Sequence, residues 1–294
     1  MSDATAKNYW ETHPEAALAN EWTANPIIGD AIYRRMTGGV GKWWLAWLME
    51  DYFGGRRFKR MLSPGCGVGD HEIAIANMGM VEQIDAFDFS RESIRLASEK
   101  AAAAGKQIRF FVDDLNSFQV PADVKYDLIF CSGCVHHCRE LERFFDVTSK
   151  ALADDGYFVL NEYVGACFNI YPPRQVEIVN RLLAALPAHL KKSADARFVN
   201  ATIQEAMRHD PSESVRSKLI LPFLEQYFKV ELRRDYGGCL THLMYPLLNH
   251  ARTGEEPKRG LGVALRLLSE FEMILVEGGV LETDFTLCVG RGKG

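Results

Sequence analysis

A glycine-rich segment is the part of the chain whose residue types and spacing first indicate ligand binding. Gly65, Gly67 and Gly69 alternate after an apolar stretch at 58–62, and the residues at 72–76 are typical of the start of a helix. Glycines let the backbone turn sharply and approach a ligand closely, and a helix N-terminus presents free N–H groups. The pattern predicts a strand, a binding turn and a helix, although a purely structural turn has the same composition.

An aspartate follows the second predicted strand at a distance that suits nucleotide binding. Asp88 lies 23 residues beyond Gly65, at the end of the strand expected at 81–89. In a βαβ nucleotide unit, a carboxylate at this place accepts hydrogen bonds from the ribose hydroxyls. The alternative is a helix cap, because Ser90 begins the next expected helix. We favour the ribose role.

Two further acids follow the third predicted strand, which we expect at 107–112. Asp113 and Asp114 are adjacent at its end. A short acid there can accept from an adenine amino group, while the next backbone N–H serves a ring nitrogen. Two neighbouring aspartates are also an ordinary turn signal, so this prediction depends on the first two.

Alternating strands and helices must position these residues. Strands are expected at 58–62, 81–89, 107–112, 126–131 and 157–162, the last of them after a turn at 154–156, and helices begin near 72, 92 and 141. This alternation predicts a parallel, doubly wound α/β sheet. In such sheets, ligands bind at the carboxyl ends of the strands, where Gly65, Asp88 and Asp114 all fall.

Composition limits the other possibilities. The 294 residues can bury one large domain with an insertion or two small domains. The net charge of −5 argues against a general nucleic-acid-binding protein. No apolar stretch approaches membrane-spanning length, and the N-terminus lacks a signal-peptide pattern, so we expect a cytoplasmic protein without a membrane partner.

Three of the seven cysteines cluster after the fourth predicted strand. Cys131, Cys134 and Cys138 could indicate a metal or iron–sulfur site, with His136 or His137 as a fourth ligand. The alternative is that they are small residues at a strand end and in the following loop. We favour packing and expect no metal.

Four segments, taken in order, resemble the motifs of the class I S-adenosylmethionine-dependent methyltransferases. Residues 62–69, 86–90, 112–115 and 126–137 are similar to the first four motifs, and residues 154–162 to the segment that follows them. The resemblance covers residues 57–163. It implies a Rossmann-like, mostly parallel sheet of seven strands whose last two form a hairpin, for which 228–236 and 284–291 are the candidates, and it implies S-adenosylmethionine as the cofactor.

The resemblance also implies roles for individual residues. Backbone groups of the glycine turn would hold the methionine portion, Asp88 the ribose, and the acids after the third strand the adenine. Ser132 would lie near the methionine amine. Ser63 stands where the family usually carries an acid, so another residue must serve the amine. The cofactor-binding candidates are Gly65, Cys66, Gly67, Asp88, Phe89, Asp113, Asp114, Leu115 and Ser132.

The chain is expected to divide into four parts. Residues 1–56 form an N-terminal helical cap, 57–163 the cofactor-binding core, 164–212 a helical lid, and 213–294 the rest of the core with an insertion between the last two strands. The alternative for the lid helix is a dimer interface. Residues 210–213 have the pattern of a helix start of the capping-box type.

Two histidines follow the fourth strand, beside the expected methyl group. A sulfonium methyl is already activated, so the protein must align the acceptor and exclude water. If the acceptor is a hydroxyl, a base helps, and we expect His136 or His137 to serve; a helix-start histidine bonded to backbone is equally consistent. Further candidates for the pocket are Glu162, Tyr163, Asp235, Tyr236, His242, Tyr9, Trp10 and Arg35.

The favoured function is therefore S-adenosylmethionine-dependent methylation of a small-molecule acceptor, with oxygen as the first choice of acceptor atom and nitrogen or carbon as alternatives. A second hypothesis is a non-catalytic partner protein that binds this cofactor. A nicotinamide oxidoreductase is the third, and it is disfavoured because Asp70 replaces the third glycine of G-x-G-x-x-G and because of the terminal hairpin.

Overall fold

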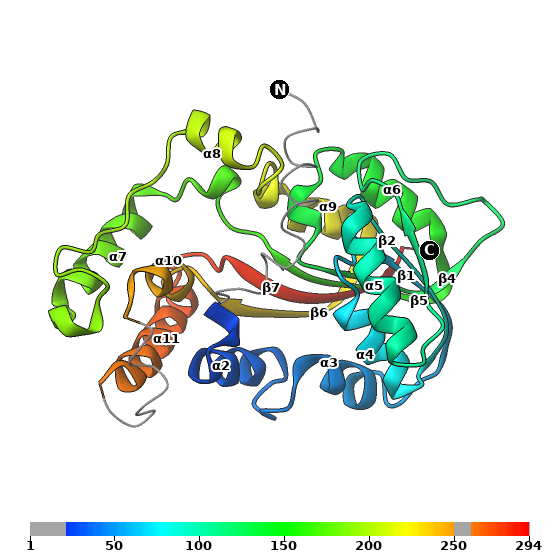
Figure 1. The fold of residues 1–294 in the computed structure, drawn as a ribbon, viewed down its shortest axis with the longest axis horizontal. Helices are drawn as coiled ribbons and strands as arrows, with labels where there is room; N and C mark the ends of the chain where they lie inside the picture. Colours follow the sequence, from blue (N-terminus) through cyan, green and yellow to red (C-terminus); the bar gives the residue numbers. More distant parts are fainter. Residues whose placement is uncertain (1–21, 250–259, 294) are drawn as a thin grey trace.

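The computed structural model describes residues 22–249 and 260–293, and its centre is a seven-stranded sheet (Figure 1). The strands are β1 (Phe58–Pro64), β2 (Val81–Asp88), β3 (Arg109–Val112), β4 (Tyr126–Ser132), β5 (Leu152–Tyr163), β6 (Phe228–Gly237) and β7 (Phe285–Gly292). Their order is β3-β2-β1-β4-β5-β7-β6. β7 runs antiparallel to both neighbours, and the other pairs are parallel. The predicted doubly wound sheet with a terminal hairpin is confirmed.

Helices precede, connect and cover the strands. They are α2 (Pro26–Met36), α3 (Trp44–Ala46), α4 (Asp70–Met78), α5 (Arg91–Ala103), α6 (Leu141–Ala151), α7 (Pro173–Ala185), α8 (Ile203–His209), α9 (Ile220–Tyr227), α10 (Thr241–Met244) and α11 (Leu261–Glu277). A π-helical stretch, η2 (Trp47–Tyr52), continues α3. Short 3-10 turns are η1 (Trp22–Ala24), η3 (Val135–His137), η4 (Cys167–Asn169), η5 (Ala188–Leu190), η6 (Ser217–Leu219) and η7 (Tyr245–Leu247).

Successive residues of each central strand enter two different hydrophobic clusters. Met61 of β1 packs with the N-terminal helices, α4 and α11, whereas Leu62 packs with α6 and α9. On β5, Val159 belongs to the same cluster as Met61, and Phe158 belongs to the same cluster as Leu62. Because side chains alternate across a strand, this division shows that helices cover both faces of the sheet, which explains the continuous apolar runs.

The register brings the carboxyl ends of the strands to one edge. Pro64 lies opposite Phe87, and Asp88 lies opposite Val112. On the other side, Ser132 lies opposite Asn161. The loops after β1, β2, β4 and β5 therefore leave the sheet together.

Two local expectations need correction. The turn expected at 154–156 lies inside β5, where the pairing passes from Tyr126–Leu152 to Leu128–Tyr157, so the intervening residues bulge. No helix starts at 210–213, because Asp210 Oδ1 accepts hydrogen bonds from the backbone and hydroxyl of Ser212, and Ser214 has a φ of 52°. The capping box lies earlier, at Thr202 and Glu205 of α8.

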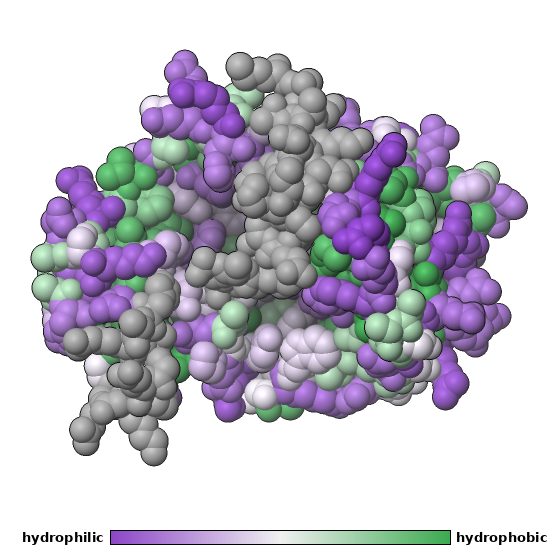
Figure 2. Space-filling view, viewed as in Figure 1, coloured by the Kyte–Doolittle hydropathy of each residue, from purple (hydrophilic) through white to green (hydrophobic). Residues whose placement is uncertain are grey.

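The visible surface mixes hydrophilic and hydrophobic side chains over the described elements (Figure 2). Among the helices of residues 22–249 and 260–293, none combines the length and apolarity that crossing a bilayer requires.

Candidate functional site

A cavity of about 580 Å³ opens where the carboxyl ends of β1, β2, β4 and β5 meet. Aromatic side chains from the N-terminal helices and the final hairpin, including Trp44 and Phe285, complete its wall. Every residue predicted as cofactor-binding or catalytic lines this one cavity: Gly65, Cys66, Gly67, Asp88, Phe89, Asp113, Asp114, Leu115, Ser132, His136 and His137. The structure therefore brings the predicted residues together, although it does not by itself assign their roles.

The glycine turn after β1 is fixed to the end of β2. The N–H of Cys66 donates to the carbonyl of Phe87, at 3.0 Å, and the N–H of Gly67 donates to Asp88 Oδ2, at 3.0 Å. Gly65 has a φ of 64°, and a Cβ on it would lie 2.4 Å from the Cβ of Cys134. Glycine is therefore required at 65 for both backbone conformation and space. Two of the amides expected to face the methionine portion are instead bonded within the protein.

Asp88 lines the cavity and also orders its rim. Besides Gly67, its carboxylate accepts from the N–H of Ser90, at 2.9 Å, and Ser90 is the N-cap of α5. The two interpretations from the sequence are thus compatible. Asp88 holds a helix start and a glycine turn while its side chain borders the cavity.

Asp113 and Asp114 form a turn at the cavity wall. Asp113 Oδ1 accepts from the N–H of Asp114, at 2.8 Å, and Asp114 Oδ1 accepts from the backbone and side-chain amides of Asn116, at 2.8 Å each. Leu115 borders the same space. The turn signal and the binding position therefore coincide here too.

A buried acid of α4 lies beside Ser63, and neither residue lines the cavity among the described residues. Ser63 Oγ lies 2.6 Å from Glu72 Oε1, and Glu72 Oε2 is buried with no hydrogen-bond partner among the described residues. Burial raises the pKa of Glu72 to about 7. Glu72 was not predicted as a notable residue, because the sequence pattern at position 72 indicated only the start of a helix.

Polar side chains join β4, β5 and β6 across the cavity wall. Asn161 Nδ2 donates to Ser132 Oγ, at 3.1 Å, and Asn161 Oδ1 accepts from the hydroxyl of Tyr236, at 2.8 Å. Tyr163 and Tyr236 line the cavity as expected. Asn161 was not predicted, since a polar residue inside a buried strand shows its partners only in three dimensions.

His136 is oriented by Glu162 at the end of β5. Glu162 accepts backbone N–H groups from Cys134, Val135 and Tyr163, at 2.6–2.9 Å, and its Oε1 lies 2.5 Å from His136 Nδ1. Burial alone would lower the pKa of His136, but Glu162 and Glu213 outweigh it and raise the pKa to about 9.

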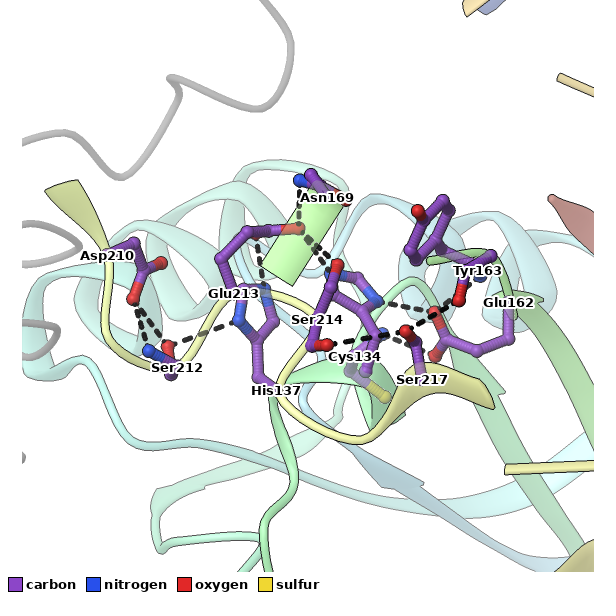
Figure 3. A network of polar contacts seen from close by, with 12 residues as sticks. Cys134, His137, Glu162, Tyr163, Asn169, Asp210, Ser212, Glu213, Ser214 and Ser217 are labelled. Atoms are coloured by element: carbon purple, nitrogen blue, oxygen red, sulfur yellow. Dashed lines mark hydrogen bonds and ion pairs between the residues drawn. The ribbon is translucent and has the colours of Figure 1, made fainter. Parts of the chain in front are cut away.

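His137 faces the segment after α8. Its Nδ1 lies 3.2 Å from Ser212 Oγ, and its Nε2 lies 3.9 Å from Glu213 Oε2. Burial and the neighbouring His136 lower the pKa of His137. Burial opposes ionisation of Glu213, but the two histidines outweigh it and hold its pKa at about 2. Figure 3 shows Glu213 directed at the His137 ring.

Neither Ser212 nor Glu213 was predicted as a site residue. Both belong to a segment with a helix-capping pattern, and their approach to the histidines depends on the path of residues 164–212.

The clustered cysteines pack in the core. Cys131, Cys134 and Cys138 are free thiols buried in the hydrophobic cluster beneath α6. Cys134 Sγ donates to the carbonyl of Pro64, at 3.1 Å, and burial raises the pKa of Cys138 to about 12. All three thiols therefore pack among apolar side chains.

Three further pocket candidates lie elsewhere. Arg35 joins α2 to the Tyr236 carbonyl and to Ser269 of α11, Asp235 pairs with Arg233, and the ring of His242 packs against Phe285. None of these three side chains is among the described lining residues of the cavity. Tyr9 and Trp10 lie outside the described residues.

Known proteins resemble the sequence and the fold. Residues 61–156 match the family model described as a methyltransferase domain. The uncharacterized methyltransferase YcgJ of Bacillus subtilis is 27% identical over 140 residues, 46% of this chain and 51% of that protein. The polyketide synthase ThaQ of Burkholderia thailandensis is 27% identical over 108 residues, 37% of this chain and 5% of that protein.

A solved structure shares the fold over nearly the whole chain. The PH0226 protein from Pyrococcus horikoshii OT3 has a TM-score of 0.51 at 16% identity, covering 98% of this chain and 99% of its own. The curated relatives, by contrast, are matched over 5%, 30% and 51% of their own lengths.

Proposed function

We propose that this chain uses S-adenosylmethionine to methylate an oxygen of a small-molecule acceptor. The match of residues 61–156 to the methyltransferase-domain model and the similarity to YcgJ support the proposal. One observation carries the proposal: the cofactor-binding candidates and the two histidines border a single cavity of about 580 Å³. That volume is typical of small-molecule sites. The similarity of 108 residues to part of a polyketide synthase supports a polyketide-like small molecule as the acceptor.

Different residues of the cavity would bind different parts of the cofactor. Asp88 would accept from the ribose hydroxyls and Asp114 would border the adenine, while Ser132 and Asn161 would lie beside the methionine portion. The sulfonium supplies the methyl group. Aromatic side chains such as Trp44 would exclude water from the reacting atoms.

The histidines would assist loss of the acceptor proton. The acceptor oxygen would gain the methyl group that the sulfonium supplies, and the acceptor proton would pass to His137. Ser212 Oγ donates to Asp210 Oδ1, at 2.7 Å, so it accepts from His137 Nδ1–H. In that tautomer, Nε2 of neutral His137 carries the lone pair that a proton acceptor needs.

The test is transfer of labelled methyl from S-adenosylmethionine to a panel of hydroxylated, amino and carbon-acid small molecules. The proposal predicts labelled methyl ethers and S-adenosylhomocysteine. His137→Ala should lower kcat by about 10²–10⁴-fold while cofactor affinity changes little. Label on nitrogen or carbon alone would contradict O-methylation, and cofactor binding without turnover across the panel would favour a non-catalytic partner.

A further inference from the structure

Three potential metal ligands meet at one wall of the cavity. Within the described part of the chain, His136, His137 and Glu213 each offer one donor atom, and all three atoms lie within 4.8 Å of one another. Both Nε2 atoms lie 3.9 Å from an oxygen of Glu213, each from a different one. We propose that these three residues bind a divalent transition-metal ion, with Zn²⁺ the best match to two imidazoles and one carboxylate.

Hydrogen-bond partners fix which ring nitrogens face Glu213. Glu162 already accepts three backbone N–H groups, so its carboxylate also accepts from His136 Nδ1–H. Ser212 Oγ likewise accepts from His137 Nδ1–H, as described above. When both rings are neutral, each Nε2 therefore carries its lone pair on the side of the Glu213 carboxylate. Three electron-pair donors then surround one space that a cation can occupy.

The surrounding groups have the features of an organised metal site. Metal-bound histidines usually donate their second N–H to a carboxylate or another acceptor, which fixes the ring. Glu162 and Ser212 provide these acceptors here, and Asn169 and Ser214 hold Glu213 Oε1 at 3.2 and 2.7 Å. Figure 3 shows this network around Glu213.

Binding a metal ion requires the three donor atoms to move closer together. Ligands at about 2.1 Å from a tetrahedral ion lie about 3.4 Å apart, whereas the three donor atoms here lie within 4.8 Å of one another. A divalent ion would place positive charge beside three carboxylates, those of Glu162, Asp210 and Glu213.

The remaining coordination position would face the cavity, which all three ligands line. If the proposed function holds, the acceptor hydroxyl would occupy it, and the ion would lower the pKa of that hydroxyl. The histidines would then assist proton loss through the metal. Metal binding itself does not depend on the proposed function.

The experiment titrates chelator-treated full-length protein with Zn²⁺ by calorimetry and with Co²⁺ by visible absorption. We expect one ion per chain and the intense bands of tetrahedral Co²⁺. His137→Ala and Glu213→Gln should abolish stoichiometric binding, and Ser212→Ala should weaken it by about 10-fold. His189→Ala, which removes an exposed histidine outside the cavity, should leave binding unchanged.

Absence of stoichiometric binding by the wild-type protein would overturn the inference, as would equal binding by His137→Ala. Far-UV circular dichroism of each variant checks that the fold is retained. Metal binding without methyl transfer would support the metal site and contradict the proposed function. Methyl transfer by protein that binds neither Zn²⁺ nor Co²⁺ would support the proposed function and contradict the metal site.

Discussion

Asp88 combines structural hydrogen bonds with a position on the cavity wall. It accepts from Gly67 and Ser90 at the rim of the cavity, so a substitution must keep an oxygen there to preserve the turn. Asparagine keeps an acceptor and removes the charge. We attribute the proposed ribose contact to that charge, because hydrogen bonds to ionised groups are stronger than those between neutral groups.

Asp88→Asn should therefore weaken binding of S-adenosylhomocysteine by about 10–100-fold, the loss of one or two charge-assisted hydrogen bonds. Isothermal titration calorimetry measures this directly. Asp123→Asn, an exposed aspartate away from the cavity, is the matched control and should bind normally. Equal affinity of the two variants would show that Asp88 does not contact the ribose.

Single residues were predictable from the sequence where local spacing determined them. Gly65, Asp88 and Asp114 each follow a strand, and parallel strands bring such positions to one edge whatever their detailed packing. Glu213 was not predictable, because its position follows from the path of a long insertion. Glu72 was missed because its partner, Ser63, lies on another element.

At the level of the glycine turn, two positions with similar backbones offer a controlled comparison. Gly65 and Gly67 have φ values of 64° and 53°, but only a Cβ at 65 meets a neighbour, Cys134 at 2.4 Å. Gly65→Ala should reduce the free energy of unfolding by about 1–3 kcal/mol more than Gly67→Ala, because it adds overpacking to the same backbone strain. Denaturant unfolding measures both, and equal losses would contradict the close approach.

Helix α4 carries a buried acid whose titration affects stability. The pKa of Glu72 is raised to about 7 in the folded protein, whereas an unfolded glutamate titrates near 4.5. Between these values the folded state binds more protons, so stability falls as pH rises from about 4.5 to 7. Asp70 and Asp88, both nearby, add to this effect.

Glu72→Gln should remove this pH dependence. In urea unfolding, the free energy of unfolding of the variant relative to the wild type should be higher at pH 8 than at pH 5 by on the order of 2–3 kcal/mol. The variant also keeps an oxygen for Ser63. If the difference in unfolding free energy between the variant and the wild type were the same at both pH values, Glu72 would be ionised throughout this range in the folded protein.

On the scale of the whole molecule, distant parts of the chain enclose the cavity. The N-terminal helices contribute Trp44, the sheet edge contributes Asp88, and the segment after α8 contributes Glu213. The alternation of strands and helices predicted the sheet, because that pattern is repeated locally. It did not predict how the insertion at 164–212 returns to the sheet.

Gln175 of α7 anchors that insertion to the terminal hairpin. Its side-chain amide donates to the carbonyl of Cys239 and to Asp284 Oδ2, both at 2.9 Å and buried. Gln175→Leu would leave both acceptors without this donor and should cost about 2–4 kcal/mol of unfolding free energy. Gln204→Leu, at an exposed position of α8, is the control, and similar losses in both variants would contradict the anchoring role.

The central claim is that this cavity binds the cofactor with its sulfur toward the histidines. A crystal structure of the protein with S-adenosylhomocysteine tests it most directly. The account predicts ribose hydroxyls within hydrogen-bonding distance of Asp88, adenine beside Asp114 and Leu115, and sulfur on the side of His136 and His137. Density for the compound elsewhere, or a cavity free of it at saturating concentration, would contradict the account.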